Sequence, residues 1–371
     1  MDLNIKQQSS NIISEKDSLR LALLKFISCI AVIYIHSYTP QYEFFKLAVD
    51  PFPAVKFTEL VFSQYIARLA VPVFFCVSGF IYFAKQYDTG LGKFAWKKFQ
   101  SILLPYFIWN TLAIFGIFAA QLPETVRRIF PPEKIVANFG VADWFNAYIG
   151  YGKAWYPFLY PLWFLPYLFA VFIVVHAFRK YFCRYDWLIW GVAAVNIVWL
   201  SYVPFGKLSG LWSTMALSVY TLSFFTMGKL LVEYKSWLDN ISVSVCSAVI
   251  YVIVITLECL HIMPEISWLT LSLYAGVILA FSLAGRLVNC SGKNKKRILF
   301  LSGFAFLIYL THEFALSALQ AVVYRVLPRQ SWLVLMTFVL LPILLTAGLI
   351  VAGYILKKLR PKVYAFLFSG R

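Results

Sequence analysis

Charged side chains are scarce in this sequence. Of its 371 residues, 13% are Asp, Glu, Lys or Arg, whereas 61% are hydrophobic. A typical soluble domain carries about 25% charged and about 45–50% apolar residues. The shortage of charge therefore excludes an ordinary soluble domain. Apolar residues spread over the whole length indicate a polytopic membrane protein instead.

The sequence also lacks the common signatures of metal and nucleotide sites. Its six cysteines and four histidines include no C-x-x-C pair and no Cys/His cluster with the spacing of metal ligands. It contains neither a P-loop nor a GxGxxG stretch. We therefore expect no disulfide framework, no metal site and no permanently bound cofactor.

Long apolar runs are the main feature that the sequence does contain. A helix needs about 20 mostly apolar residues to span a bilayer, whereas strands of a membrane barrel alternate over about ten residues. The runs thus predict an all-α, polytopic integral membrane protein with about ten transmembrane helices. The predicted helices cover Leu19–Tyr38, Phe62–Ala84, Ser101–Ala119, Tyr160–Phe178, Trp187–Val203, Leu211–Val232, Ile241–Leu260, Ser267–Ala284, Ile298–Val322 and Trp332–Leu356.

The positive charges predict the topology of these helices. There are 33 lysines and arginines against 16 acidic residues, which gives a net charge of +17. Most of the basic residues lie in segments on the same side of the membrane as the N-terminus. The positive-inside rule therefore places both termini in the cytoplasm, with residues 1–18 and 357–371 flanking a single transmembrane domain within 1–371. The basic charge then reflects topology and contact with the lipid bilayer, and we expect no nucleic-acid partner.

Ionisable residues inside the predicted helices are the candidates for chemistry, because charge in hydrocarbon is costly. Lys25 and His36 are 11 residues apart in the first helix, so they share a face about 16 Å apart along the axis. The alternative for this pair is structural. In that case Lys25 snorkels to the cytoplasmic interface and His36 marks the outer end of the helix.

Three further ionisable residues lie inside other helices. Arg68 lies in the outer third of the second helix, where snorkelling outward is the alternative explanation. His312 and Glu313 lie about two-thirds of the way across the ninth helix, with apolar neighbours on both sides, so they favour a functional role. Tyr309 is one turn before His312 on the same face. Together with His36, these residues fall in the outer half of the membrane, which predicts one shared cleft.

Five stretches of the chain, taken in order, resemble the motifs of a known family. They read KFISCIAVIYIH, ARLAVPVFFCVSGFIYF, KKFQSILLPYFIW, LWFLPYLFAVFIV and FAFLIYLTHEFAL. This series is similar to that of the membrane-bound acyltransferase-3 family, the bacterial O-acyltransferases of surface polysaccharides. The resemblance runs from about residue 18 to residue 356. Within the family, the chain looks most like the enterobacterial common antigen O-acetyltransferase type.

One position departs from the family pattern. The first motif of the family begins with Arg, and this chain has Lys25 there. The positive charge is kept, but the planar, bidentate guanidinium is lost. Lysine can still contact a phosphate or carbonyl as a point charge.

The resemblance implies an acyltransferase of the bacterial inner membrane. Such an enzyme would move an acetyl group from cytoplasmic acetyl-CoA to a hydroxyl of a surface polysaccharide or lipid-linked glycan. His36 would then act as general base, and Arg68 would stabilise the oxyanion that develops on the thioester. His312 and Glu313 would orient the acceptor or share the proton.

The resemblance also assigns binding roles. The anionic nucleotide end of acetyl-CoA would stay at the basic cytoplasmic rim, where Lys97 and Lys98 are candidates, and its thin arm would pass Lys25. Trp163, at the outer mouth of the fourth helix, and Tyr309 are candidates for contact with the acceptor.

Several alternatives stay open on the sequence alone. These are a covalent acetyl-histidine relay, an acyl group other than acetyl such as succinyl, the identity of the sugar, and a homo-oligomeric state. The main rival class is a transporter or flippase for a lipid-linked glycan. Such a protein would usually show paired halves with matching interruptions, which the sequence lacks. A non-catalytic sensor or scaffold is the third class.

Overall fold

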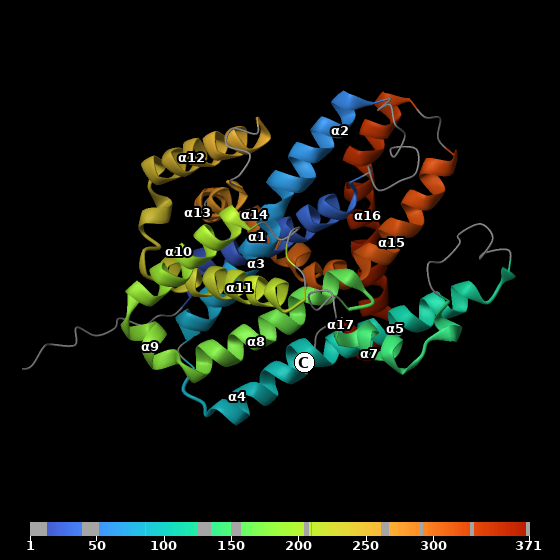
Figure 1. Ribbon diagram of the computed structural model, residues 1–371, viewed down its shortest axis with the longest axis horizontal. Helices are drawn as coiled ribbons and strands as arrows, with labels where there is room; N and C mark the ends of the chain where they lie inside the picture. The colour runs from blue at the N-terminus through green and yellow to red at the C-terminus, as the bar shows by residue number, and fades with distance from the viewer. Residues whose placement is uncertain are drawn as a thin grey trace, which may run out of the picture.

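The computed structural model describes residues 13–38, 52–85, 87–124, 135–149, 157–203, 208, 210–260, 267–288, 292–326 and 330–368. These described residues form helices and contain no strand, as Figure 1 shows. Within these described residues, nine helical runs are long and apolar enough to cross a membrane. The predicted all-α membrane fold is therefore confirmed.

The nine runs follow the order expected from the sequence. They are α1 (Glu15–His36); α2 (Pro53–Glu59) with η3 (Leu60–Ile66), η4 (Ala67–Leu69) and α3 (Ala70–Lys85); α4 (Leu91–Lys98) with η5 (Phe99–Leu103) and α5 (Leu104–Gln121); η7 (Tyr160–Trp163) with α8 (Phe164–Ala177); α11 (Gly210–Glu233); α12 (Ile241–Cys259); α13 (Leu269–Leu287); α15 (Ala305–Val326); and α16 (Ser331–Leu359).

The fifth predicted helix is shorter than the others. It corresponds to α10, a 17-residue apolar helix. The remaining helices are short and connect or flank the long ones: η6 (Val136–Asn138), α7 (Val141–Ile149), α9 (Arg179–Arg184), α10 (Asp186–Tyr202), η9 (Trp237–Asp239), α14 (Gly292–Ser302) and α17 (Pro361–Phe368).

The ninth predicted helix is not continuous. The apolar pattern predicted one helix over 298–322, but the chain turns at Gly303 and divides this stretch between α14 and α15. The Gly303 N–H donates to the carbonyls of Leu299 and Phe300, and the Phe304 N–H donates to that of Leu301. These bonds tighten the end of α14, as is common at helix termini. Hydropathy alone did not reveal the turn because both sides of it are apolar.

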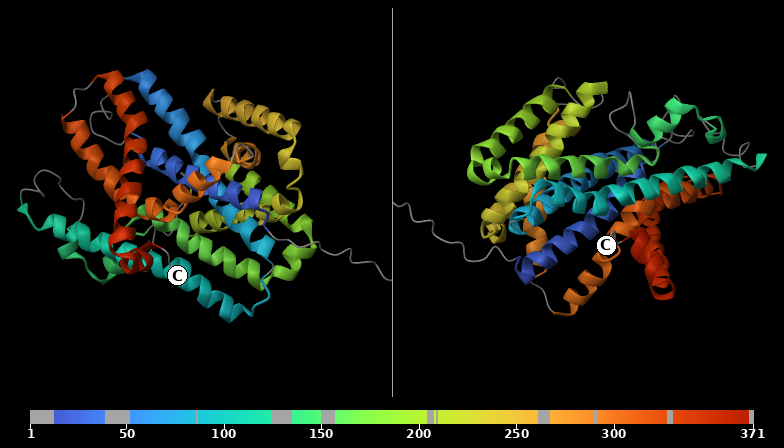
Figure 2. Two further views of the ribbon diagram at one scale, coloured as in Figure 1. Left: turned by 180° about the vertical axis from the view of Figure 1, so that it is seen from behind. Right: turned by 90° about the horizontal axis from the view of Figure 1, so that it is seen from below.

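Helix α1 lies in the middle of the bundle. It contacts α3 and α13 as well as α14, α15 and α16 (Figure 1). Ser14 begins the helix as its N-cap, since its hydroxyl accepts a hydrogen bond from the Asp17 N–H. The second views show the same central position and the short C-terminal helix α17 beside α16 (Figure 2).

Two glycines allow α3 and α11 to pack at backbone distance. A Cβ added to Gly79 would overlap the carbonyl of Phe225, and one added to Gly228 would lie 2.6 Å from the carbonyl carbon of Gly79. Small residues at helix crossings permit such close approach in membrane proteins. Gly79, in the second motif, thus allows α3 to pack closely against α11.

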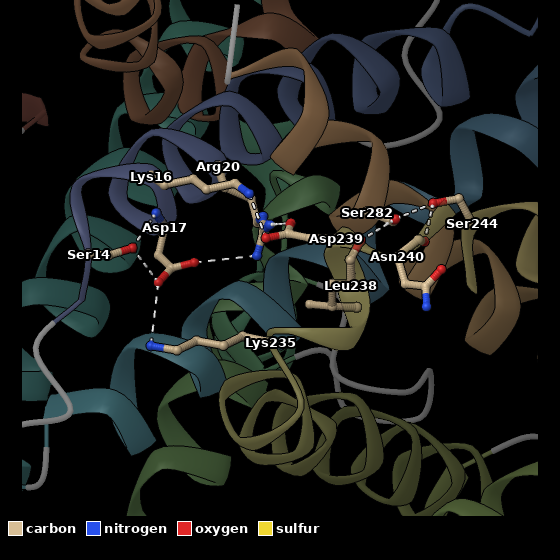
Figure 3. Close-up of polar contacts among 10 residues, drawn as sticks. All are labelled: Ser14, Lys16, Asp17, Arg20, Lys235, Leu238, Asp239, Asn240, Ser244 and Ser282. Atoms are coloured by element: carbon tan, nitrogen blue, oxygen red, sulfur yellow. Dashed lines mark hydrogen bonds and ion pairs between the residues drawn. The ribbon is translucent and has the colours of Figure 1, made fainter. Parts of the chain in front are cut away.

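An ion-pair cluster joins the N-terminal end of α1 to the short helix η9 (Figure 3). Arg20 is 1% exposed, and its guanidinium lies 3.3 Å from Asp17 Oδ1 and 2.5 Å from Asp239 Oδ1. Lys16 Nζ lies 2.5 Å from the second oxygen of Asp239. Gly285 on α13 packs against the Arg20 guanidinium, where a Cβ would overlap it. The cluster therefore anchors the end of α1 that we predict to be cytoplasmic.

Candidate active site

A cavity of about 180 Å³ lies between α1, η4, α3, η7 and α15. Four of the residues singled out from the sequence line it: His36, Arg68, Trp163 and Tyr309. They come from four separate helical runs, so the fold brings together residues that are far apart in the chain. The other lining residues are Val32, Ile35, Val71, Phe74, Tyr160, Pro161, Phe164, Leu217 and Tyr220.

His36 is the last residue of α1 and contacts a carboxylate on α15. Its Nδ1 lies 3.2 Å from Oε2 of Glu313, and both side chains are partly buried. The rings of His36 and His312 lie with their centroids 5.4 Å apart. His312 and Glu313 are not among the cavity-lining residues, and they reach the cavity through His36. His36 in the cavity wall thus forms one group with His312 and Glu313, which lie behind it.

The hydrogen bonds of His312 define its tautomer. Its Nδ1 lies 2.7 Å from the carbonyl oxygen of Tyr309 and 3.2 Å from that of Ile308. A carbonyl oxygen can only accept, so Nδ1 carries a proton and donates. The side chain is 1% exposed, and its Nε2 has no hydrogen-bond partner among the described residues. An unpaired buried acceptor is costly, and it often marks a site of chemistry or an absent ligand.

Tyr309 ties α15 to the segment that carries Trp163. Its hydroxyl donates to the carbonyl of Pro161 at 2.7 Å, and the Tyr309 side chain is buried. Pro161 lies in the 3₁₀ turn η7, which ends at Trp163. Because this hydroxyl is already bonded to the protein, the contribution of Tyr309 to the cavity is its ring face.

Arg68 lies in an irregular part of its helix. It belongs to the 3₁₀ turn η4, which follows the π-helical segment η3 and precedes α3. Pro72 explains part of this irregularity, because proline has no N–H to donate to the carbonyl of Arg68 and its ring clashes there. π-helical segments within α-helices occur frequently at functional sites.

The guanidinium of Arg68 is held by an amide. Its Nε donates to Gln64 Oε1 at 3.2 Å, and its Nη2 donates to the same oxygen. Arg68 is exposed, and it also lines the cavity. A neutral amide orients the guanidinium without neutralising its charge, so the charge remains available to an anion at the cavity wall.

The predicted donor-binding lysines lie away from the cavity lining. Lys25 is partly buried on α1, and Lys97 is exposed near the end of α4. The Lys98 ammonium lies 3.6 Å from the centroid of the Phe172 ring, a cation–π contact. The structure thus brings together four predicted site residues around the cavity and leaves these three outside it.

His36, His312 and Glu313 also form a donor set that could hold a metal ion. Their ligand atoms all lie within 4.8 Å of one another. Two histidines and one glutamate are the ligands of some catalytic zinc sites, in which each ligand atom lies about 2.0–2.2 Å from the ion. Spacing along the sequence did not reveal this set, because α1 and α15 supply it from opposite ends of the chain.

Two tyrosines of the cavity wall were not among the predicted site residues. Tyr160 faces His36 edge-on, with ring centroids 6.0 Å apart, and Tyr220 is buried on α11. Tyr160 lies within one turn of Trp163, so its place at the outer mouth was a usable signal. Tyr220 had no such signal, because aromatic residues make up 19% of the chain.

Comparison with protein families identifies the class of this protein. The family described as an acyltransferase domain, of the acyltransferase-3 type, matches residues 19–357, nearly the whole chain. The chain belongs to the acyltransferase-3 family. Comparison with curated proteins and with solved structures gives no match.

Family membership makes this chain a membrane acyltransferase. The matched region of this acyltransferase-3 protein contains every residue of the cavity lining, as well as His312 and Glu313. The cavity is therefore the candidate active site of the acyltransferase.

Proposed function

We propose that this protein is an O-acetyltransferase of the bacterial inner membrane. It transfers the acetyl group of cytoplasmic acetyl-CoA to a hydroxyl of a surface polysaccharide or lipid-linked glycan of the enterobacterial common antigen type. The observation that carries the proposal is the cavity in which His36 and Arg68 share a wall, with Glu313 3.2 Å from His36 Nδ1.

In the proposed reaction, His36 takes the proton of the acceptor hydroxyl. The hydroxyl oxygen attacks the carbonyl carbon of the thioester, and the carbon–sulfur bond breaks. CoA leaves as a thiolate, which takes up the proton from the His36 imidazolium. Because Nδ1 of His36 faces Glu313, Nε2 is the nitrogen that accepts the proton. A carboxylate beside an imidazole stabilises the imidazolium that forms, as in catalytic triads.

In the proposed reaction, Arg68 stabilises the negative charge of the transition state. When the hydroxyl attacks, the thioester oxygen becomes an oxyanion and needs preorganised donors nearby. Gln64 accepts from two guanidinium nitrogens of Arg68, which orients the group before the substrate arrives. Removing one such donor typically costs about 10²–10³ in rate.

The donor must reach this cavity from the cytoplasmic side. The nucleotide of acetyl-CoA is strongly anionic and stays in water, whereas the thin arm can extend between helices. Lys25 lies about 16 Å below His36 on α1 and supplies a positive charge along that path. Lys97 is exposed and remains our candidate at the rim, together with Lys98.

The acceptor sugar would meet the aromatic residues at the outer mouth. Trp163, Tyr160 and Tyr309 present ring faces or edges to the cavity. Rings of this kind supply a large apolar surface with little conformational freedom to lose.

Acetyl transfer by the purified protein tests the proposal. The protein is reconstituted in vesicles and supplied with labelled acetyl-CoA and a panel of lipid-linked glycans. We expect label in a glycan with the wild type and none above background with His36→Ala. Ile27→Ala, on an exposed position of the same helix, serves as the matched control and keeps activity. If no acceptor is labelled while the vesicles still translocate glycan, the enzyme hypothesis is contradicted and a flippase is favoured.

Sensitivity to chelators separates proton transfer from metal chemistry at the same three side chains. With His36 acting as a base, we expect untagged protein to keep its activity after dialysis against EDTA and phenanthroline. Elemental analysis of the same sample checks the metal content. Loss of activity on dialysis, with recovery on adding Zn²⁺, would instead assign His36, His312 and Glu313 as metal ligands.

A further inference from the structure

A second, larger cavity lies further along α11, nearer its C-terminal end than the candidate active site. It is about 460 Å³ in volume and opens between α10, α11 and α13, close to η9. This volume falls in the range of about 300–1,000 Å³ that is typical of small-molecule pockets. No charged side chain is among its lining residues in the described part of the chain. A ligand of this groove must therefore be apolar along most of its length.

The length of the groove matches one leaflet of a bilayer. On α11 it is lined by Ser223, Met227 and Leu230, and Tyr234, the residue that follows the helix, continues this row. From Ser223 to Tyr234 the helix rises by about 16 Å. The hydrocarbon core of a bilayer is about 30 Å thick, so the groove reaches from one interface to about the midplane.

The end of the groove near η9 has the residues of a membrane interface. Trp190, Tyr234 and Trp237 line this end, and they are 61%, 45% and 65% exposed. Tryptophan and tyrosine gather at the level of the lipid headgroups. Lys235 follows Tyr234, has a side chain 46% exposed, and lies 3.8 Å from Asp17 in a long ion pair. An ammonium at this depth attracts the phosphate of a lipid headgroup.

The hydroxyls at the end of the groove near Tyr274 are already hydrogen-bonded to the protein. The Tyr274 hydroxyl lies at this end and accepts a hydrogen bond from Asn196 Nδ2 at 2.8 Å. It also forms a hydrogen bond with the Ser223 hydroxyl. Because these hydroxyls are already paired, an apolar chain end can rest against the Tyr274 ring without stranding a polar group.

We propose that this groove holds one acyl chain of a phospholipid from the leaflet that the predicted topology makes cytoplasmic. The chain extends along α11 toward Tyr274, and the headgroup lies at the aromatic residues and Lys235. The isoprenoid tail of a glycan carrier is disfavoured as the occupant, because the proposed acceptor sugar is on the opposite side of the membrane. The bound lipid packs α10 and α13 against α11, the helix that also contributes Leu217 and Tyr220 to the candidate active site.

Photo-crosslinking with a defined lipid tests the proposal. The full-length protein is reconstituted in phosphatidylethanolamine vesicles that contain phosphatidylglycerol with a diazirine at the end of one acyl chain. After illumination, we expect labelled peptides from α11 and α13 near Ser223 and Tyr274. Ala193→Trp fills the groove and should lower this labelling about tenfold, equivalent to about 1.4 kcal/mol of binding. Val195→Trp, at an exposed position two residues along α10, should leave it unchanged.

Three results would overturn the assignment. One is labelling spread evenly over all lipid-facing helices, and another is equal labelling of wild type and Ala193→Trp. The third is displacement of the label by polyprenyl phosphate but not by unlabelled phospholipid, which would identify a carrier lipid instead. Ile278→Trp fills the groove from α13 and provides an independent variant if Ala193→Trp does not fold.

Discussion

Glu313 and His312 both lie beside the imidazole of His36. Glu313 Oε2 lies 3.2 Å from Nδ1, and in the proposed function this contact leaves Nε2 for the substrate. His312 is held by two backbone carbonyls, so its proton is fixed on Nδ1 and its Nε2 is an acceptor. At the scale of single residues, the site therefore contains one histidine whose Nδ1 faces a carboxylate and one whose Nδ1 proton is held by backbone carbonyls.

Replacing Glu313 by Gln tests the role of the carboxylate. The amide keeps the shape of the side chain but cannot stabilise an imidazolium. We expect kcat for acetyl transfer to fall about 10²–10⁴-fold, the usual contribution of a positioned acid–base group. Ser317→Ala removes only a 3.4 Å hydrogen bond to Glu313 Oε1 and should retain most activity. Equal losses in the two variants would contradict an electrostatic role for Glu313.

Replacing Arg68 by Gln tests the oxyanion role. An interaction made only in the transition state lowers kcat and leaves KM for acetyl-CoA nearly unchanged. We expect kcat to fall about 10²–10³-fold, with Arg68→Lys intermediate because lysine keeps the charge but not the fork. Steady-state kinetics over a range of acetyl-CoA concentrations provides both constants. A rise in KM at constant kcat would show that Arg68 binds the donor in its ground state.

The grouping of four candidate residues around one cavity could be predicted from the sequence, but the full lining of that cavity could not. His36 and Arg68 were selected because ionisable residues in hydrocarbon are costly, Trp163 because of its place at the outer mouth, and Tyr309 because it shares a face with His312. All four line one cavity. Their chemical roles remain predictions. Tyr220 resembles the many structural tyrosines of the chain, and only the packing of α11 distinguishes it.

At the scale of helices, irregular backbone occurs where the chemistry is proposed. Segments η3 and η4 interrupt the second long helix immediately before Pro72, and Arg68 lies within η4. Proline in the sequence could predict an interruption but not its form, since kinked, 3₁₀ and π geometries all relieve the same clash. The turn at Gly303 was missed because a glycine within an apolar run is compatible with either a continuous or a broken helix.

The close crossing of α3 and α11 makes Gly79 sensitive to any side chain. In Gly79→Ala, the new methyl group overlaps the Phe225 carbonyl, so the helices must separate. We expect a loss of about 1–3 kcal/mol or more in stability, the usual cost of overpacking a core. Thermal unfolding in detergent measures the change. Gly116→Ala is the matched control, because a Cβ there meets no atom within 4 Å and should improve helix propensity. A similar melting temperature for both variants would exclude the tight crossing.

At the scale of the whole molecule, the ion-pair cluster around Arg20 joins segments that are distant in sequence. Helix α1, η9 and α13 meet there, so the cluster closes one end of the bundle (Figure 3). Burial tends to raise the pKa of the Asp239 carboxyl, but the hydrogen bond from Lys16 and the charge of Arg20 outweigh it. The pKa of Asp239 is therefore lowered from its ordinary value.

This lowered pKa predicts that part of the stability is lost in acid. A carboxyl whose pKa is lower in the folded state stabilises the fold above its unfolded pKa of about 3.9, and the contribution is lost as pH falls through the folded value. We expect Asp239→Asn to melt below the wild type at pH 7, and the difference to shrink progressively below about pH 4. Melting curves of both proteins across this range measure it. A difference that is constant with pH would exclude an ionic contribution.

This long-range pairing could not be predicted from the sequence. The basic residues near the N-terminus were counted as cytoplasmic charge, which is a property of composition. The assignment of Asp239 as partner of Lys16 and Arg20 depends on how η9 folds back against α1, and local patterns carry no information on that contact. The order and type of the long helices, in contrast, followed from hydropathy because the bilayer imposes length and apolarity on each one.

Helix α1 is held near both of its ends, by the carboxylates around Arg20 and by Glu313 beside His36. The number of residues between these two attachments is therefore a functional length. One added residue would turn His36 by about 100° away from Glu313 and shift it by about 1.5 Å, whereas about four would restore its direction at a different depth. A sequence that conserves every side chain of the site can thus still be inactive if this helix gains or loses a residue.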